Sequence, residues 1–218
     1  MITKFSAVLF DLDGTLLNTL DDLADSMNTA LEKNGFPTHP VASYKYFVGD
    51  GLMNLVLRSL PATDRDETTV KSLMAAQQKE YSRCWAEKTR PYDGVPELLD
   101  ELGRVKIKLC VLSNKPDQFT KIIVEKFLPK AKFAIVRGES KDTPRKPDPS
   151  GANQISSELK LSPTKFLYVG DTGTDMKTAV ASSMFPAGAL WGFRPPEELV
   201  TTGAKALIEQ PLDLLQLL

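Results

Sequence analysis

The sequence predicts an α/β protein with a parallel β-sheet, interrupted near its N-terminus by an all-helical segment. Short apolar, β-rich runs recur along the chain, and helical patterns separate them, which is typical of βαβ units. The apolar runs cover residues 5–10, 107–112, 133–136, 166–169 and 186–190, and the helical stretches cover about 95–104, 117–128, 149–159 and 174–182.

Residues 17–91 break this alternation. Apolar residues recur there at helical spacing, first at Leu20, Leu23 and Met27 and then at Leu52 and Leu55, and a third helical pattern covers about 64–88. We find no convincing strand in this segment. We therefore expect a helical domain of residues 17–91 to be inserted into a core made of residues 1–16 and 92–218.

Composition excludes several classes of protein. The 218 residues are 42% hydrophobic and 25% charged, which is ordinary for a globular protein, and the net charge of -1 gives no field that attracts nucleic acid. Acidic residues interrupt the N-terminus too early for a signal peptide, and no apolar stretch approaches the roughly 20 residues of a membrane span. The two cysteines, Cys84 and Cys110, suggest no disulfide framework. We expect a cytoplasmic protein that binds neither nucleic acid nor membranes.

Polar clusters follow the predicted strands. Because the carboxyl ends of parallel strands share one edge of a sheet, we expect these clusters to meet there. Converging carboxylates repel one another unless a cation lies among them, and oxygen ligands without histidine or thiolate favour Mg²⁺. The clusters are Asp11-Leu12-Asp13-Gly14-Thr15, Ser113-Asn114-Lys115, Gly170-Asp171-Thr172-Gly173-Thr174-Asp175 and the loop Pro144-Arg145-Lys146-Pro147-Asp148-Pro149.

The order DxDGT, strand-terminal serine, lysine and GDxxxD, spread over residues 11 to 175, resembles the haloacid dehalogenase superfamily of phosphotransferases. The resemblance is closest to its phosphoglycolate phosphatase-like branch, through Arg90-Pro91-Tyr92-Asp93-Gly94-Val95, Ser113-Asn114-Lys115, Arg145-Lys146-Pro147 and Trp191-Gly192-Phe193-Arg194. It implies a Rossmann-like, doubly wound core with the helical insertion as a cap domain. It also implies a Mg²⁺-dependent phosphatase that hydrolyses a small phosphomonoester through an aspartyl-phosphate.

The resemblance assigns roles to four acids. Asp11 would be the nucleophile and a metal ligand, and Asp13 the general acid/base, in surroundings that favour its neutral form, with its backbone carbonyl on the metal. Asp171 would bind the metal directly. Asp175 would bind it through water or orient Lys146; the alternative is an acid that only stabilises the first turn of a helix.

Two further motifs would bind the phosphoryl group. Ser113 would donate a hydrogen bond to it, Asn114 would help to bind substrate, and Lys146 would neutralise its charge. The alternative for Ser113 is an N-cap of the helix that begins near Pro116. Only the resemblance favours Lys146 over Lys141 and Arg145, which are competitors in the same segment.

Other residues receive smaller roles. We expect Thr15 and Thr172 to bond to the backbone of their own loops. In the insertion, Gly49-Asp50-Gly51 and Arg58 resemble the cap motif that faces the active site, so Gly49 and Arg58 are candidate substrate-binding residues. The alternative is an ordinary start of a helix, with Arg58 in solvent.

The sequence also leaves activities other than phosphomonoester hydrolysis open. A phosphosugar mutase uses the same pair of aspartates, and a pyrophosphatase or a non-catalytic binding protein on the same fold is also conceivable. A dehalogenase needs neither Asp13 nor a metal, and the position of Asp13 also argues against a phosphonatase. The expected partner is a small phosphorylated metabolite, and we expect a monomer or a weak homodimer.

Overall fold

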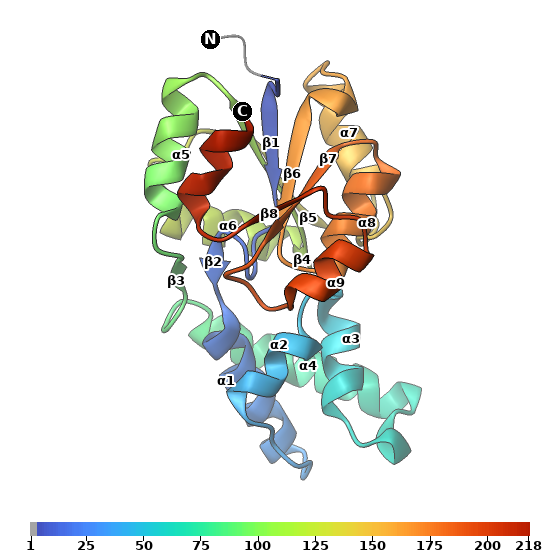
Figure 1. Cartoon of the computed structure of the whole chain (residues 1–218). Helices are drawn as coiled ribbons and strands as arrows, with labels where there is room; N and C mark the ends of the chain where they lie inside the picture. The colour runs from blue at the N-terminus through green and yellow to red at the C-terminus, as the bar shows by residue number, and fades with distance from the viewer. Residues whose placement is uncertain (1–3) are drawn as a thin grey trace. The chain divides into compact units, whose positions relative to one another are not determined.

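The computed structural model describes residues 4–218, and a six-stranded parallel sheet forms its core (Figure 1). The order of the strands is β5-β4-β1-β6-β7-β8, so the first strand lies in the middle of the sheet. The strands are β1 (Ala7–Phe10), β4 (Lys108–Pro116), β5 (Phe133–Glu139), β6 (Phe166–Gly170), β7 (Phe185–Ala189) and β8 (Ala206–Ile208). A central β1 places the residues that follow it between the ends of β4 and β6.

Helices cover both faces of this sheet, which makes it doubly wound. On one face, Ala7 and Leu9 of β1 join a buried cluster with Ala152 and Ile155 of α7 and Ala179 of α8. The opposite face carries α5 and the C-terminal 3₁₀ helix (Figure 1). The helices of this unit are α5 (Val95–Arg104), α6 (Asp117–Phe127), α7 (Ser150–Glu158), α8 (Gly173–Ala181) and α9 (Pro196–Thr201), with 3₁₀ turns at Pro163–Lys165 and Pro211–Leu217.

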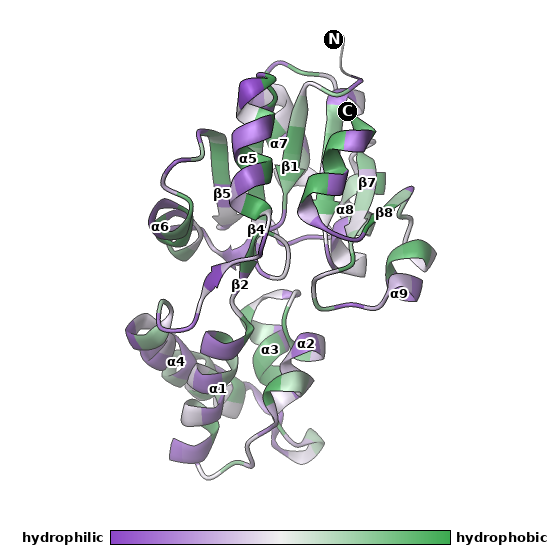
Figure 2. Ribbon diagram, turned by 60° about the vertical axis from the view of Figure 1, so that its left-hand side comes forward, coloured by the Kyte–Doolittle hydropathy of each residue, from purple (hydrophilic) through white to green (hydrophobic). Residues whose placement is uncertain are grey.

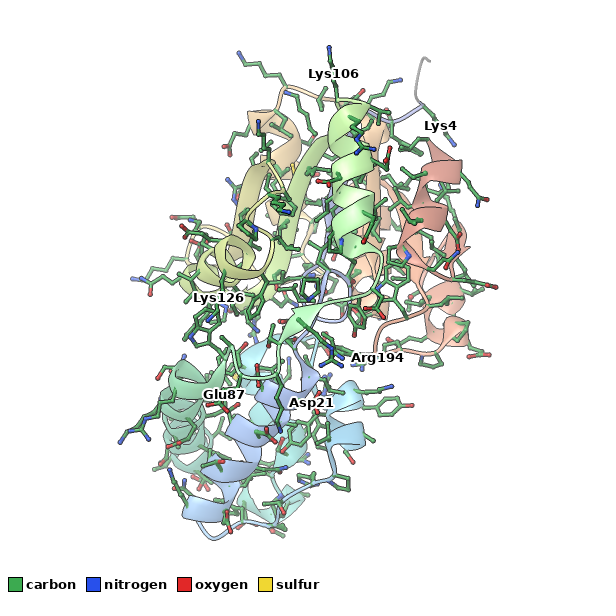
Figure 3. All side chains as sticks on the ribbon, turned by 90° about the vertical axis from the view of Figure 1, so that its left-hand side faces the viewer. Lys4, Asp21, Glu87, Lys106, Lys126 and Arg194 are labelled. Atoms are coloured by element: carbon green, nitrogen blue, oxygen red, sulfur yellow. The ribbon has the colours of Figure 1, made fainter. Side chains whose placement is uncertain are left out.

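The apolar runs form strands because both of their faces are covered. Every residue of β1 is buried, and so is every residue of β6. A strand buried on both faces reads as a continuous apolar run rather than an alternating one. Figure 2 shows the hydrophobic strands inside helices whose outer faces are hydrophilic. Lys4 and Lys106, which precede β1 and β4, project from the opposite edge of the sheet to the carboxyl ends (Figure 3).

The second compact unit is all-helical. The chain divides into one unit of Met1–Leu17 with Pro91–Leu218 and another of Asn18–Arg90. The second unit contains α1 (Leu20–Lys33), α2 (Tyr44–Phe47), α3 (Gly51–Ser59), α4 (Glu67–Cys84) and 3₁₀ turns at Val41–Ser43 and Ala62–Asp64. Two two-residue strands, β2 (Leu17–Asn18) and β3 (Arg90–Pro91), pair where the chain passes between the units.

Apolar and polar contacts both stabilise the helical unit. Leu23 and Met27 of α1 and Leu73 of α4 are buried, and the two helices pack on each other. Asp22, which is 1% exposed, accepts hydrogen bonds from the backbone N–H groups of Lys88 and Thr89, at 2.9 and 2.8 Å. A buried carboxylate is tolerated here because these donors satisfy it.

The fold class expected from the sequence is confirmed, and its elements differ in detail. β8, α9 and the β2–β3 pair were not expected, and β4 continues through Ser113-Asn114-Lys115 to Pro116 instead of ending before them. Cys84 and Cys110 are both free thiols. Among residues 4–218, no helix combines the length and the apolar character that crossing a bilayer requires.

Candidate active site

The polar clusters meet at the carboxyl edge of the sheet. Asp11 directly follows β1, and Asp171 directly follows β6, its neighbour in the sheet. On the other side of β1, β4 contributes Ser113 and Lys115. Lys146 comes from the loop between β5 and α7. The parallel topology therefore brings together residues that are far apart in sequence.

Three buried acids form the centre of this site. Asp11, Asp171 and Asp175 each have a carboxylate oxygen within 4.8 Å of the others, and they are 5%, 0% and 0% exposed. Burial raises the pKa of Asp11 well above its usual range, and the charge of Asp175 raises it further while Lys146 opposes the shift. Burial and the charge of Asp175 raise the pKa of Asp171 to about 7. Oxygen-only ligands this close together fit a hard divalent cation, which would relieve their repulsion.

Lys146 joins two of these acids. Its Nζ lies 2.8 Å from Oδ1 of Asp11 and 2.7 Å from Oδ1 of Asp175, and its side chain is 2% exposed. Burial lowers the pKa of Lys146, but the charges of Asp11 and Asp175 outweigh that effect and raise it above its usual value. The ammonium group therefore stays charged beside the carboxylate of Asp11. Its competitors lie elsewhere: Arg145 pairs with Glu139, and Lys141 is exposed.

Asp171 is held by two loops. Its Oδ1 accepts a hydrogen bond from the Thr15 hydroxyl at 2.9 Å, and its Oδ2 accepts one from the backbone N–H of Phe193 at 2.8 Å. The indole of Trp191 donates to the backbone carbonyl of Thr15 at 2.9 Å. Thr15 thus bonds to the acid, and the expectation that it bonds to its own backbone was wrong.

Asp175 belongs to a capping box at the start of α8. Thr172 is the N-cap, its hydroxyl donates to Oδ2 of Asp175 at 2.7 Å, and its backbone N–H donates to the same oxygen at 3.1 Å. The other oxygen of Asp175 accepts from Lys146. Asp175 therefore makes the contacts that two of its three considered roles need, a cap at the first turn of α8 and an ion pair with Lys146, while its binding of metal through water remains a prediction.

Asn114 contacts the backbone of Lys146. Its Oδ1 accepts the Lys146 N–H at 2.7 Å, and its Nδ2 donates to the Lys146 carbonyl at 3.1 Å. Ser113 is 3% exposed, and its Oγ accepts the Lys115 N–H at 3.2 Å. Ser113 is not the N-cap of α6, because that position belongs to Pro116.

Asp13 faces a lysine that had no predicted role. Lys115 Nζ lies 3.0 and 2.9 Å from the two carboxylate oxygens of Asp13, and the two side chains are 4% and 12% exposed. An ammonium group is not the surrounding that we expected for an acid that must carry a proton. Asp13 is also absent from the group formed by Asp11, Asp171 and Asp175.

Within the helical unit, Arg58 contacts residues of its own unit. It forms an ion pair with Asp50 at 2.5 Å and donates to the backbone carbonyls of Tyr46 and Phe47, at 3.3 and 3.2 Å. Gly49 precedes this pair, with a positive φ of 116° that favours glycine. These contacts account for the local motif without a ligand, so substrate binding by Gly49 and Arg58 remains a prediction.

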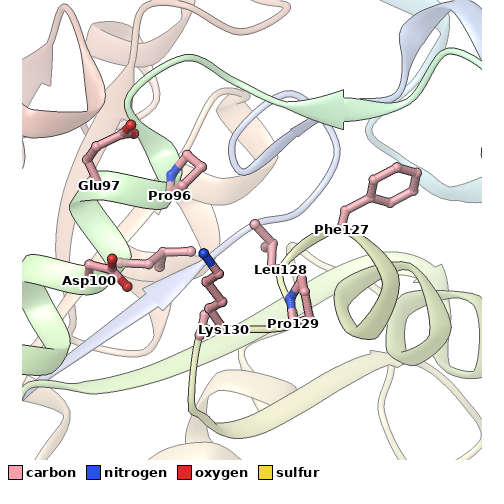
Figure 4. Close-up of a pocket in the computed structure, with 9 residues that line it drawn as sticks. Pro96, Glu97, Asp100, Phe127, Leu128, Pro129 and Lys130 are labelled. Atoms are coloured by element: carbon pink, nitrogen blue, oxygen red, sulfur yellow. The ribbon is translucent and has the colours of Figure 1, made fainter.

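A surface pocket of about 370 Å³ lies elsewhere on the core, between the first turns of α5 and the segment after α6 (Figure 4). Its polar lining consists of Glu97, Asp100 and Lys130, and the rest includes Pro96 and Phe127. None of the predicted site residues lines it. We therefore assign no catalytic role to this pocket.

Three residues in the site were not identified from sequence. Thr15 and Lys115 lie in the motifs themselves, and their polar side chains within a buried strand or tight turn were the available signal. Tyr168 of β6 is fully buried, and its environment includes Lys146 and Asp175. Burial raises the pKa of the Tyr168 phenol well above its usual value, so it stays neutral beside Lys146. A tyrosine in a buried strand gives no such signal, because most serve packing.

Comparison with protein-family models shows which family this chain belongs to. The model for haloacid dehalogenase-like hydrolases matches residues 8–189, which is most of the chain. The chain belongs to this family. The matched region begins in β1 and ends with β7, and so includes every residue of the acid cluster.

Individual proteins that are similar to this chain include several phosphatases. A phosphoglycolate phosphatase of Pseudomonas syringae pv. tomato is 30% identical over 218 residues, which cover 95% of this chain and 80% of the relative. An N-acetylmuramic acid 6-phosphate phosphatase of Pseudomonas aeruginosa is 27% identical and covers 99% and 95% of the two chains. The crystal structure of a candidate phosphoglycolate phosphatase from Lactobacillus delbrueckii subsp. bulgaricus is 29% identical, with a TM-score of 0.91 over 97% of both chains. The expectation of a phosphoric monoester hydrolase is confirmed.

Proposed function

We propose that this protein hydrolyses a small phosphomonoester through an aspartyl-phosphate on Asp11, with Mg²⁺ as cofactor and phosphoglycolate as the candidate substrate. The observation that carries the proposal is the Lys146 ammonium between Asp11 and Asp175, beside Asp171. This arrangement places a fixed positive charge beside one carboxylate, where it can neutralise the charge of a phosphoryl group that this carboxylate attacks. The names of the relatives support the candidate substrate.

The first half of the reaction forms the covalent intermediate. A carboxylate oxygen of Asp11 attacks phosphorus, the bond from phosphorus to the leaving oxygen breaks, and Asp13 donates a proton to that oxygen. The two polar contacts of Asp11, with the Leu12 N–H and with Lys146, both fall on Oδ1. We therefore assign the attack to Oδ2. Lys146 and Ser113 supply positive charge and a hydrogen bond to the phosphoryl oxygens.

The second half releases phosphate. Asp13 accepts a proton from the water that attacks phosphorus, and the bond between phosphorus and Asp11 breaks. Asp11, the Asp13 backbone carbonyl and Asp171 would hold Mg²⁺, with Asp175 acting through Lys146 or through a water. Bound Mg²⁺ would neutralise phosphoryl charge and orient the substrate.

The charges of the site favour a divalent cation. Four carboxylates, those of Asp11, Asp13, Asp171 and Asp175, accompany two ammonium groups, those of Lys115 and Lys146. These six groups leave a formal charge of two negative units when all are ionised. A divalent cation balances that charge, and carboxylate oxygens are the ligands that Mg²⁺ prefers.

The proposal extends to the helical unit, the cellular compartment and the oligomeric state. We propose that residues 17–91 act as a cap domain that supplies substrate selectivity, through residues such as Gly49 and Arg58. The free thiols of Cys84 and Cys110 favour a reducing compartment such as the cytoplasm. We also propose that the protein is a monomer or a weak homodimer and acts on a small phosphorylated metabolite.

A substrate panel tests the function. The purified protein, with Mg²⁺ and with EDTA, is assayed for release of inorganic phosphate from phosphoglycolate, sugar phosphates and pyrophosphate, and for sugar-phosphate isomerisation. We expect release from phosphoglycolate, loss of activity in EDTA, and a fall of at least about 10³-fold in Asp11→Asn. Glu101→Gln, on the surface of α5, is the control and keeps its activity. Predominant isomerisation, or full activity in Asp11→Asn, contradicts the proposal.

A further inference from the structure

Lys115 is a buried cation that the proposed roles leave unused. Its side chain is 4% exposed, and its ammonium group contacts both carboxylate oxygens of Asp13, at 3.0 and 2.9 Å. A buried lysine is costly unless it is paired, and a pair of this kind is weak evidence for stability alone. The pair therefore calls for an explanation in the chemistry of Asp13.

The backbone of Lys115 is fixed on several sides. It lies in β4, its N–H donates to Ser113 Oγ at 3.2 Å, and its carbonyl accepts from the Thr120 hydroxyl at 3.2 Å. The backbone of β5 packs against the same carbonyl, because a Cβ on Gly138 would lie 2.5 Å from it. The ammonium group thus projects from a rigid strand, as a side chain that positions another must.

The backbone of Asp13 is fixed, and its carboxylate contacts Lys115 through both oxygens. Asp13 follows β1 in a turn closed by the Gly14 N–H to the Leu17 carbonyl at 2.9 Å, and it forms a β-bridge with Leu17. Contact of one ammonium group with both oxygens sets the direction of the carboxylate. The two buried lysines contact different acids: Lys146 contacts Asp11 and Asp175, and Lys115 contacts Asp13.

We propose that Lys115 is a positioning residue that orients the Asp13 carboxylate as the base of the hydrolytic half-reaction. The inference rests on the proposed function. In that half-reaction the water O–H bond breaks, its proton moves to a carboxylate oxygen of Asp13, and the oxygen forms the bond to phosphorus as the bond to Asp11 breaks. Lys115 itself exchanges no proton. Loss of Lys115 then slows hydrolysis of the aspartyl-phosphate more than its formation.

Burst kinetics with p-nitrophenyl phosphate separate the two halves. Its leaving group departs without a proton, so formation of the aspartyl-phosphate does not depend on Asp13 as an acid. In Lys115→Met we expect a burst of p-nitrophenolate close to one per enzyme at the wild-type rate, and a steady-state rate lower on the order of 10²-fold. Lys146→Met, by contrast, lowers the burst rate, because Lys146 contacts the nucleophile. Lys121→Met, a surface lysine paired with Asp117 on α6, changes neither phase.

A double variant tests whether Lys115 acts through Asp13. If it does, Lys115→Met adds no further loss to Asp13→Asn, and the double variant has the steady-state rate of Asp13→Asn alone. The double variant also removes both charges together, so it stays measurable if Lys115→Met leaves an unpaired acid that prevents folding. Equal losses in burst and steady state, unchanged kinetics in Lys115→Met, or additive losses in the double variant overturn the inference. An inactive wild type instead contradicts the phosphatase itself.

Discussion

At the scale of single residues, the site depends on how closely Gly14 approaches Asp171. A Cβ built on Gly14 would lie 2.3 Å from Oδ2 of Asp171, and the φ of Gly14 is +88°. From the other side, a Cβ on Gly192 would lie 2.2 Å from the Cβ of Asp171. The acid is enclosed by backbone on two sides, which explains why a glycine follows Asp13.

We predict that Gly14→Ala impairs both stability and activity, and two other glycines, Gly35 and Gly103, serve as controls for this prediction. Gly35 has a positive φ of +76° and nothing within 4 Å of an added Cβ, and Gly103 in α5 has neither constraint. We expect Gly35→Ala to lose about 1 kcal/mol through its backbone conformation and Gly103→Ala to gain about 0.5–1 kcal/mol. Gly14→Ala should lose more stability than Gly35→Ala and at least about tenfold in kcat, because Asp171 must move. Urea denaturation and steady-state kinetics check this, and a Gly14→Ala variant that behaves like Gly35→Ala in both contradicts it.

The sequence predicts which kinds of residue gather in the site better than it predicts their partners. Carboxylates after two buried strands indicate the acid cluster, because parallel strands end at one edge. The partner of each acid depends on loop conformation and on side-chain direction. Hence the sequence analysis did not identify Lys115 as the partner of Asp13 or Thr15 as the partner of Asp171, although both residues lie in recognised motifs.

At the scale of elements, the N-terminus of α8 serves both folding and the site. Thr172 caps the helix through its contacts with Asp175, and the same acid contacts Lys146. A second helix, α4, is also capped by a side chain: Asp66 accepts the backbone N–H groups of Thr68 and Thr69, each at 3.0 Å. The two caps differ in their contacts: Asp175 also contacts Lys146, whereas Asp66 contacts Thr68 and Thr69 of its own helix.

We expect the two caps to respond differently to removal. Thr172→Ala should cost about 1 kcal/mol of stability and also lower kcat, because Asp175 loses the hydroxyl that fixes it opposite Lys146. Asp66→Ala should destabilise the protein and leave kcat unchanged. Thermal denaturation and phosphate release measure the two effects. Equal kcat values for the two variants would show that the cap of α8 does not position Lys146.

The elements that the sequence predicts well are those with long apolar or amphipathic patterns. β1 and β6 are continuous buried runs, and α5 has buried leucines on one face only. β8 has three residues, and α9 has six and begins at a proline. Patterns so short do not distinguish a strand or helix from a loop, and tertiary packing decides their structure.

At the scale of the whole molecule, a nearly neutral protein contains a concentrated negative charge. The net charge is -1 over 218 residues, while Asp11, Asp171 and Asp175 meet at one buried point. A net charge this small does not attract an anionic substrate from a distance, so local cations such as Lys146 must attract it. The cluster also links the stability of the fold to pH and to metal.

The pH dependence of stability follows from the raised pKa of Asp171, about 7 in the folded state against 3.8 as the ordinary value. Below pH 3.8 the Asp171 carboxyl is protonated in both the folded and the unfolded state, so its burial costs no stability through ionisation. As pH rises toward 7 the unfolded chain ionises first, so the metal-free protein should lose on the order of a few kcal/mol. Asp11 shifts in the same direction.

Urea denaturation between about pH 4 and 8, in EDTA and in excess MgCl₂, measures this linkage. In metal-free protein, the buried Asp171 should oppose the stability that acids with lowered pKa values, such as Asp66 and Asp148, add as pH rises. Added Mg²⁺ should stabilise the protein most at pH 7 and above, where the carboxylates are free to bind it. Asp171→Asn removes the titrating proton while keeping one acceptor oxygen, so between pH 4 and 7 its metal-free stability should rise more, or fall less, than that of the wild type. An Asp171→Asn variant whose stability depends on pH as the wild type's does would show that burial of this acid does not affect the pH dependence of the fold.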